Sequence, residues 1–319
     1  MRPERPIARL NFRMLLIKPK AIRICYLIIL LISSQNLTFG QSSCEKLLAK
    51  GSKIQKLAGD FSFTEGPASD KKGDIYFTDQ PNNRILKWST DNKLSTFSDH
   101  SGRANGMYFD HNGNLITCSD EKNELWSISP SGTIVILAKN FNGKRLNGPN
   151  DLWITPEGGI YLTDPFYKRP WWNYDTLEQD GEHVYYLAPG ASTLIRVISD
   201  LKQPNGIIGT PDGKLLYVAD IRAGKTWCYT IGKGGQLSNK KLFADQGSDG
   251  MTIDNRGNIY LTGNGVTVYS KKGVLITKIP IEEKWTANVC FGAKDRHLLF
   301  ITASKSVYGL RMKVRGPKW

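Results

Sequence analysis

The stretch MTIDNRGNIYLTG, residues 251–263, decides the fold. It reads as a short apolar strand, a turn that carries Asn and Gly, and a second strand rich in Ile, Leu and Tyr, which is the pattern of a β-hairpin. Five further segments follow the same plan. They are PASDKKGDIYFTD from Pro67, MYFDHNGNLITCSD from Met107, LWITPEGGIYLTD from Leu152, IIGTPDGKLLYVAD from Ile207 and VCFGAKDRHLLFITA from Val289.

The six segments recur at a nearly regular interval. Their turns are anchored at Gly73, Gly113, Gly158, Gly213, Gly257 and Arg296, with spacings of 40, 45, 55, 44 and 39 residues. Repeats of about 40–50 residues with several short strands are typical of β-propeller blades. We therefore predict an all-β fold, a six-bladed β-propeller over residues 60–312, preceded by an N-terminal lead-in at 41–59 and followed by a basic tail at 313–319.

A polar residue stands eight positions before every turn anchor. These residues are Glu65, Asn105, Asn150, Asn205, Asp249 and Asn288. Because the first strand of each blade lines the central channel, they are expected to form a ring at one channel mouth. Carboxylate and amide oxygens are ligands for hard cations, so the ring predicts a central-channel metal site for a divalent cation, with Ca²⁺ favoured and Mg²⁺, Mn²⁺ or Zn²⁺ as alternatives. The competing interpretation is turn chemistry, since several of these residues precede Gly.

The N-terminal segment has the features of an export signal. Residues 24–32 form a short apolar run, ICYLIILLI, after basic residues, and Thr38-Phe39-Gly40 offers a small-residue cleavage site. We predict a signal peptide at 1–40, cleavage after Gly40, and a periplasmic or secreted protein with no stable membrane span after signal removal. An uncleaved signal anchor is the alternative.

Composition excludes several classes of protein. The chain of 319 residues has 40% hydrophobic and 23% charged residues, which argues against disorder. The net charge of +14 includes +6 from residues 1–40, and the remaining bases are dispersed, so no nucleic-acid partner is expected. Cys44, Cys118, Cys228 and Cys290 make no CxxC pair, and the last three fall in apolar strand patterns that favour free thiols.

At these residues the chain is similar to the gluconolactonase/regucalcin family of six-bladed propellers. The resemblance covers roughly residues 60–312. The matching stretches are Phe63-Thr-Glu-Gly-Pro67, Arg145-Leu-Asn-Gly-Pro-Asn-Asp151, Tyr161-Leu-Thr-Asp-Pro165, Pro204-Asn-Gly206, Ser248-Asp-Gly-Met251 and Asn288-Val-Cys-Phe-Gly292.

The resemblance implies roles for the ring residues. It implies a divalent metal, usually calcium, bound by Glu65, Asn205 and Asp249, with Asn150 at metal or substrate and Asp249 as proton acceptor and donor. The regucalcin branch has a substrate-binding Arg where this chain has Gly148, whereas Arg145 follows the bacterial gluconolactonase pattern. The insertion Phe166–Gly181 is this chain's own, and its aromatic side chains are expected either to stack on a sugar ring or to cap a blade.

These observations predict a metal-dependent hydrolase that opens a sugar-acid lactone. The metal is expected to polarise the ester carbonyl and Asp249 to activate water. We expect Asn105, Asn150, Asn288 and Arg145 to bind the substrate. Two alternatives remain: an exported propeller that binds a partner and holds a structural metal, or a hydrolase of other esters. A lyase would need a catalytic acid that the sequence does not reveal, and the oligomeric state stays open.

Overall fold

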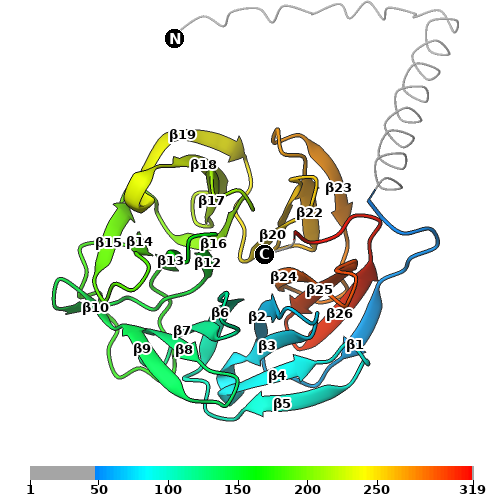
Figure 1. Ribbon diagram of the computed structural model, residues 1–319, viewed down its shortest axis with the longest axis horizontal. Helices are drawn as coiled ribbons and strands as arrows, with labels where there is room; N and C mark the ends of the chain where they lie inside the picture. The colour runs from blue at the N-terminus through cyan, green and yellow to red at the C-terminus, as the bar shows by residue number, and fades with distance from the viewer. Residues whose placement is uncertain (1–46, 318–319) are drawn as a thin grey trace, which may run out of the picture. The chain divides into compact units, whose positions relative to one another are not determined.

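The computed structural model describes residues 47–317. The predicted signal peptide, its cleavage after Gly40, and Cys44 lie outside the described residues. Six four-stranded antiparallel sheets are arranged around a central axis (Figure 1). The predicted all-β, six-bladed propeller is therefore confirmed.

The first three blades follow the chain in order, and each runs from its inner to its outer strand. They consist of β2 (Thr64–Ser69), β3 (Ile75–Asp79), β4 (Arg84–Trp88) and β5 (Leu94–Ser98); β6 (Ala104–Phe109), β7 (Leu115–Ser119), β8 (Glu124–Ile128) and β9 (Ile134–Ala138); and β12 (Leu152–Ile154), β13 (Ile160–Asp164), β14 (His183–Leu187) and β15 (Leu194–Ile198).

The last three blades repeat this arrangement until the chain closes. They consist of β16 (Pro204–Gly209), β17 (Leu215–Asp220), β18 (Lys225–Ile231) and β19 (Leu237–Ala244); β20 (Met251–Ile253), β21 (Ile259–Leu261), β22 (Val266–Tyr269) and β23 (Leu275–Ile279); and β24 (Thr286–Gly292), β25 (Leu298–Ala303), β26 (Ser306–Arg311) and β1 (Gln55–Ala58). A separate two-stranded hairpin joins β10 (Asn140–Phe141) to β11 (Lys144–Arg145). The helices in the described part are two short 3₁₀ turns, η1 (Gln80–Asn82) and η2 (Lys233–Gly235).

The sixth blade is completed by a strand from the other end of the chain. Strand β1 pairs with β26 in antiparallel register, with Gln55 opposite Gly309, and the two lie side by side in Figure 1. The propeller was expected to begin at residue 60. It begins at Gln55 instead, because β1 supplies the fourth strand of the last blade. This pairing closes the circle of blades, which removes the open edge that a five-and-three-quarter propeller would expose.

The segment expected as a basic tail is tied to the body of the propeller as far as residue 317. The backbone N–H of Lys313 donates to the carbonyl of Leu47 at 2.7 Å, and Gly316 donates to Arg296 at 2.9 Å. The side chain of Val314 is buried. These contacts lie at the end of the blades that carries the turn of Arg296, opposite to the ring described below.

The predicted hairpin turns are present between the first and second strands of the blades. Gly73, Gly113, Gly158, Gly213 and Gly257 all adopt a positive φ, between 68° and 94°. Arg296 takes the equivalent conformation in the sixth blade with φ of 58°, although a side chain is disfavoured there. The turn anchors read from the sequence are therefore the positions at which the backbone requires the left-handed region.

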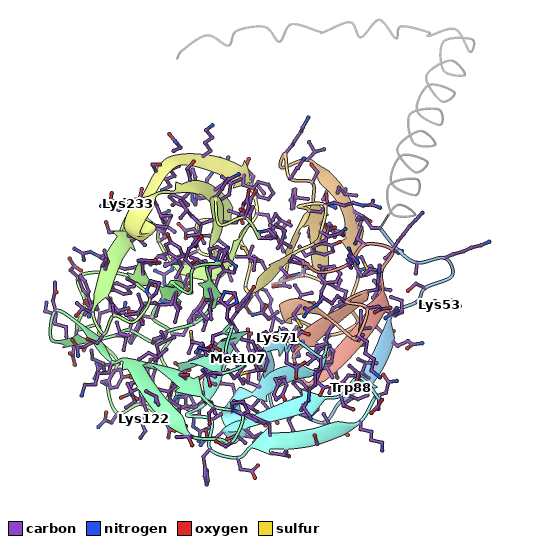
Figure 2. All side chains as sticks on the ribbon, viewed as in Figure 1. Lys53, Lys71, Trp88, Met107, Lys122 and Lys233 are labelled. Atoms are coloured by element: carbon purple, nitrogen blue, oxygen red, sulfur yellow. The ribbon has the colours of Figure 1, made fainter. Side chains whose placement is uncertain are left out.

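Side chains fill the space within and between the blades (Figure 2), and most of the buried ones are apolar. The largest fully buried ones include Trp153, Tyr161, Tyr260 and Phe77. In Figure 2, the buried Met107 lies near the axis and the exposed Lys53, Lys122 and Lys233 lie near the outer edge. Cys118 and Cys290 are buried free thiols and Cys228 is a half-buried one, as the sequence predicted. Among residues 47–317, no helix is long and apolar enough to cross a membrane.

Candidate functional site at the channel mouth

The six polar positions predicted from the repeat lie at the inner end of each blade, where its first strand begins. We call Glu65, Asn105, Asn150, Asn205, Asp249 and Asn288 the ring. Five of them are buried, with 2–6% of their surface exposed, while Asp249 is partly exposed. All except Asn288 line one pocket of about 230 Å³. The remaining lining residues are Phe63, Gln80, Tyr167, Arg169, Ile221 and Trp285.

A repeated backbone irregularity sets the direction of these side chains. In the first, second, fourth and sixth blades, the pairing of the first two strands shifts register at or beside the ring position, as between Glu65 and Ala68 and between Pro204 and Ile207. Such β-bulges bend a strand and re-aim a side chain, and they are common beside active sites. In the third and fifth blades, the paired strand begins two residues after the ring position, at Leu152 and Met251.

The glycines that follow four ring residues have a packing role. A Cβ atom on Gly206 would lie 2.4 Å from the carbonyl oxygen of Asp249, and one on Gly250 would lie 1.9 Å from Cγ of Asn288. These distances are far below van der Waals contact, so only glycine lets neighbouring blades approach this closely at the axis. The Asn-Gly and Asp-Gly pairs of the ring therefore serve blade packing, and the turn interpretation of these dipeptides is wrong.

Glu65 is held deep in the pocket. Its Oε2 accepts the backbone N–H of Gly66 at 2.7 Å and the Nδ2 of Asn288 at 3.2 Å. Burial, reinforced by the negative charge of Asp249, raises the pKa of Glu65 well above its usual value. An ionised Glu65 would therefore be stabilised by a positive charge placed between the two carboxylates.

Asp249 is fixed by an indole that the sequence analysis did not select. The Nε1 of Trp285 donates to Oδ2 of Asp249 at 2.6 Å, from the loop between β23 and β24. Burial raises the pKa of Asp249 to about 6, although the Trp285 hydrogen bond and the charge of Arg169 act in the opposite direction. The carboxyl thus titrates close to neutrality, where a general base is effective.

Asn205 presents an oxygen that the protein leaves without a partner. Its Nδ2 donates to the hydroxyl of Tyr167 at 2.9 Å, which fixes the orientation of the amide. Its Oδ1 is buried and accepts no hydrogen bond within residues 47–317. A buried acceptor without a partner is costly, and it points to a ligand that the site is built to bind.

The donor set of the pocket fits a hard divalent cation. It combines two carboxylates, Glu65 and Asp249, with the unpartnered amide oxygen of Asn205 and the adjacent Asn150. Calcium accepts carboxylate and amide oxygens in flexible geometry. Within the described part of the chain, no group of three His, Cys, Asp or Glu side chains is placed to hold a metal, so amide oxygens would have to complete the coordination here.

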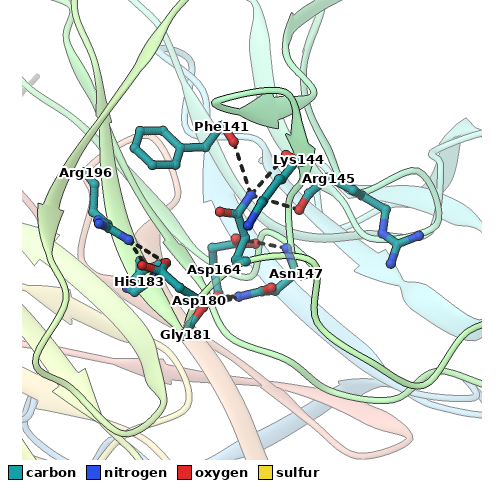
Figure 3. Close-up of polar contacts among 10 residues, drawn as sticks. Phe141, Lys144, Arg145, Asn147, Asp164, Asp180, Gly181, His183 and Arg196 are labelled. Atoms are coloured by element: carbon teal, nitrogen blue, oxygen red, sulfur yellow. Dashed lines mark hydrogen bonds and ion pairs between the residues drawn. The ribbon is translucent and has the colours of Figure 1, made fainter.

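The structure does not bring Arg145 into this pocket. Its guanidinium lies 3.4 Å from the ring centroid of Tyr174, and its Nη1 is 3.3 Å from Oε1 of Glu178. Arg145 begins the segment that leads to Asn150, but its side chain points away from the residues that anchor that segment (Figure 3). A role of Arg145 in substrate binding remains a prediction.

The segment before Asn150 is fastened by a buried carboxyl. Asp164 accepts the backbone N–H of Asn147 at 2.9 Å (Figure 3). It also accepts the backbone N–H of Gly148 at 2.8 Å. The side-chain amide of Asn147 donates to the carbonyls of Asp164 and Gly181. Burial outweighs the two backbone hydrogen bonds and raises the pKa of Asp164 to about 7. These contacts join the ring to the insertion that follows β13.

The insertion Phe166–Gly181, which we call the rim loop, supplies residues that the sequence did not place at the site. Tyr167 and Arg169 line the pocket, while Trp172 is buried and stacks on Tyr174 with ring centroids 5.1 Å apart. Some of the aromatic side chains therefore pack among themselves while Tyr167 lines the pocket, and stacking on a sugar ring remains a prediction. The unusual 55-residue spacing was the sequence signal for this loop. No signal in the sequence singled out Trp285.

A further buried carboxyl, that of Asp151, lies next to the ring and was not selected from the sequence. Asp151 follows Asn150 and is buried, with its Oδ1 accepting the backbone N–H of Leu152 at 2.9 Å. Burial raises the pKa of Asp151 to about 8. It does not line the pocket, and at neutral pH its protonated form is favoured.

Comparison with known proteins finds gluconolactonases both by sequence and by structure. The SMP-30/Gluconolactonase/LRE-like region model matches residues 63–305. A gluconolactonase of Zymomonas mobilis is 30% identical over 306 residues, covering 85% of each chain. A diisopropyl-fluorophosphatase of Loligo vulgaris is 26% identical, covering 66% of this chain and 74% of that protein. The solved structure of a gluconolactonase from Xanthomonas campestris superposes with a TM-score of 0.77 at 27% identity, covering 82% of this chain and 90% of that one.

Proposed function

Because the chain belongs to the SMP-30/gluconolactonase/LRE-like family, we propose that it is a lactone hydrolase of the gluconolactonase type, acting on the lactone of a sugar acid. The observation that carries this proposal is the pocket, which is lined by the two carboxylates of Glu65 and Asp249 together with Asn205, whose amide oxygen has no partner. A propeller that binds a partner without a metal has no need of paired carboxylates in a pocket of this kind.

We further propose that the pocket holds one divalent cation, with calcium favoured by the oxygen donors. Glu65, Asn150, Asn205 and Asp249 would hold it. When bound, the cation supplies a Lewis acid that polarises the lactone carbonyl and stabilises negative charge on its oxygen. The raised pKa of Glu65 is consistent with a site completed by a positive charge.

Asp249 is the proposed general base. Its carboxylate accepts a proton from the attacking water, and its pKa near 6 keeps a large ionised fraction at neutral pH. Trp285 holds Oδ2 of Asp249, so the carboxylate is oriented before substrate arrives. Asn105 and Asn150 line the same pocket and are suited to hold substrate hydroxyl groups, and Asn288 acts through its hydrogen bond to Glu65.

The test is hydrolysis across a panel of lactones, measured before and after treatment with a chelator. We expect sugar-acid lactones to be opened, the rate to fall after chelation, and calcium to restore it. The panel should include a fluorophosphate ester, because the squid relative carries the name of a fluorophosphatase. Absence of any lactone hydrolysis in the calcium-supplemented protein would refute the proposal and favour the binding-protein alternative.

We also propose that the protein acts outside the cytosol, in the periplasm or after secretion. The basis is the apolar run at 24–32 with its basic flank and the cleavage site at Gly40. Mass spectrometry of the exported protein should find Gln41 as the first residue. An intact N-terminus on the exported protein would count against a cleaved signal.

A further inference from the structure

The rim loop brings one cation to the edge of the pocket. Arg169 lines the same pocket as Glu65 and Asp249, and 20% of its side chain is exposed. It belongs to the segment between β13 and β14, which the other five blades do not have at this length. Arg169 is therefore a feature of this chain and not of the repeated blade.

One side of the Arg169 guanidinium forms an ion pair. Its Nε lies 2.6 Å from Oδ2 of Asp120, a buried carboxylate that also accepts the Nε2 of Gln80 at 2.9 Å. The guanidinium lies beside the aromatic rings of Tyr167 and Trp171, with distances of 5.5 and 5.7 Å to the ring centroids. These contacts fix the plane of the guanidinium and reduce the entropy that a substrate would have to overcome to order it.

The other side of the guanidinium is open. Neither terminal nitrogen of Arg169 has a hydrogen-bond partner among residues 47–317, so the pair of N–H groups at the end of the guanidinium, one from each terminal nitrogen, is available to a ligand. Two parallel donors at a fixed separation match two neighbouring oxygen atoms of a ligand. The pocket therefore offers a preorganised fork rather than a mobile charge.

The loop that carries Arg169 is rigidly attached. The indole Nε1 of Trp172 donates to the carbonyl of Asp120 at 3.0 Å, and the hydroxyl of Tyr174 donates to Oδ1 of Asn123 at 2.6 Å. Both acceptors belong to the turn between β7 and β8, in the neighbouring blade. Arg169 is thus held from the rim loop and from the second blade together.

The same loop excludes a side chain at position 148. A Cβ on Gly148 would lie 2.8 Å from Cη2 of Trp172 and 3.2 Å from Oδ1 of Asp120. Gly148 also has a φ of 150°, which a side chain rarely adopts. No side chain can therefore enter the pocket from position 148, and the guanidinium of Arg169 enters from the rim loop instead.

We propose that Arg169 is the specificity-determining residue of this pocket, donating from its two terminal nitrogens to adjacent hydroxyl oxygens on the lactone ring. The ligand class is a polyhydroxylated lactone, as opposed to a lactone without ring hydroxyls. This inference rests on the proposed lactonase function. Desolvating the donors without giving them acceptors is unfavourable, so an unsubstituted lactone gains nothing from Arg169.

The test compares two six-membered lactones in the calcium-supplemented full protein: glucono-δ-lactone, with ring hydroxyls, and δ-valerolactone, without them. We expect Arg169→Met to lower kcat/KM for gluconolactone by about tenfold to hundredfold, mainly through KM, because charged hydrogen bonds are lost. Turnover of valerolactone should change by less than about twofold when it is measured well above the pKa of Asp249, so that loss of the Arg169 charge leaves the base ionised, since valerolactone makes no such bonds. Arg169→Lys retains the charge but not the fork, so it should resemble Arg169→Met.

Arg103→Met is the matched control. Its guanidinium lies 4.6 Å from the ring centroid of Trp171, yet it does not line the pocket. A change in the position of the rim loop would affect both lactones, so the ratio of their kcat/KM values should stay at the parent value in this variant.

The outcomes separate the inference from the function on which it rests. An equal loss for both lactones in Arg169→Met, or full recovery of gluconolactone turnover in Arg169→Lys, would overturn the inference, because the role would then be structural or purely electrostatic. An unchanged ratio in both variants would overturn it as well. Failure of the parent protein to open either lactone would instead refute the proposed function, and the inference with it. If Arg169→Met does not fold, the ratio in Arg169→Lys decides.

Discussion

The ring and the rim loop are built in opposite ways. Each ring residue is placed by a device that recurs in the blades: the start of an inner strand and, in most blades, a bulge or a following glycine that permits close approach to the next blade. The rim loop occurs once, and contacts found nowhere else hold it, such as the indole of Trp172 on Asp120. The comparison teaches that the fold repeats the placement of polar side chains at the channel mouth, whereas a single insertion supplies Tyr167 and Arg169 to the pocket beside them.

The largest effect is expected from breaking the repeated device. In Gly206→Ala, the new Cβ would lie 2.4 Å from the backbone carbonyl oxygen of Asp249, so neighbouring blades must separate at the axis. We expect the free energy of unfolding to fall by about 3 kcal/mol or more, as for overpacked cores. Thermal or urea unfolding followed by circular dichroism measures it.

Gly113→Ala is the control for this prediction. Gly113 has a φ of 85°, but a Cβ there would meet no atom within 4 Å. Its cost should be only the backbone strain, about 1–2 kcal/mol. If the two variants lose equal stability, close blade packing is not the reason for glycine at position 206.

A second variant removes the carboxyl of Asp164, which joins the ring to the rim loop. Asp164→Asn replaces one acceptor for the backbone N–H groups of Asn147 and Gly148 with a donor. We expect a loss of about 2 kcal/mol near pH 4, from one unsatisfied backbone group. Urea unfolding at a series of pH values measures it.

The pH dependence of that loss has a definite sign. Burial raises the pKa of Asp164 to about 7, so between about pH 4 and 7 the folded state binds more protons than the unfolded state. The stability contributed by the protonated carboxyl is present at low pH and is lost as pH rises through 7. Asn cannot ionise, so the gap between parent and variant should narrow from pH 4 to pH 7. A gap that widens would mean that the backbone hydrogen bonds to the ionised carboxylate outweigh burial.

The smallest effect is expected within the rim loop. Trp172→Phe keeps an aromatic ring against Tyr174 but loses the hydrogen bond to the carbonyl of Asp120. We expect a loss of about 1 kcal/mol in stability and a rise in KM for the hydroxylated lactone, with the metal requirement unchanged. Unfolding and steady-state kinetics measure the two effects. A shift in the metal requirement would show that the rim loop and the ring are not separable.

The difference between the ring and the rim loop also explains which parts of the site the sequence could predict. The ring was predictable, because a constant offset of eight residues from six turn anchors implies a common depth in the channel. The role of glycine after the ring residues was not, because close approach between blades is a tertiary contact that a dipeptide does not reveal.

The positions of residues outside the repeat could not be predicted from the sequence, for physical reasons. Arg145 was selected by its motif, yet its side chain packs on Tyr174, whereas Arg169 reaches the pocket because Asp120 of another blade orients it. Strand β1 was left outside the propeller, because its partner β26 lies at the far end of the chain. Both depend on contacts between segments that no local pattern encodes.

The most direct test of the central claim, that the ring holds a cation and Asp249 is the base, is the hydrolysis rate of gluconolactone against calcium concentration for three ring variants. Glu65→Gln and Asp249→Asn should both need more calcium. Asn288→Ala removes the hydrogen bonds to Glu65 and from the backbone N–H of Val289 but no carboxylate, so it should need less of an increase. At saturating calcium, Glu65→Gln should recover most of the rate, whereas Asp249→Asn should remain about a hundredfold or more below the parent because the base is gone. Full recovery of Asp249→Asn would contradict the assignment of the base, and an unchanged calcium requirement in all three variants would contradict the cation site itself.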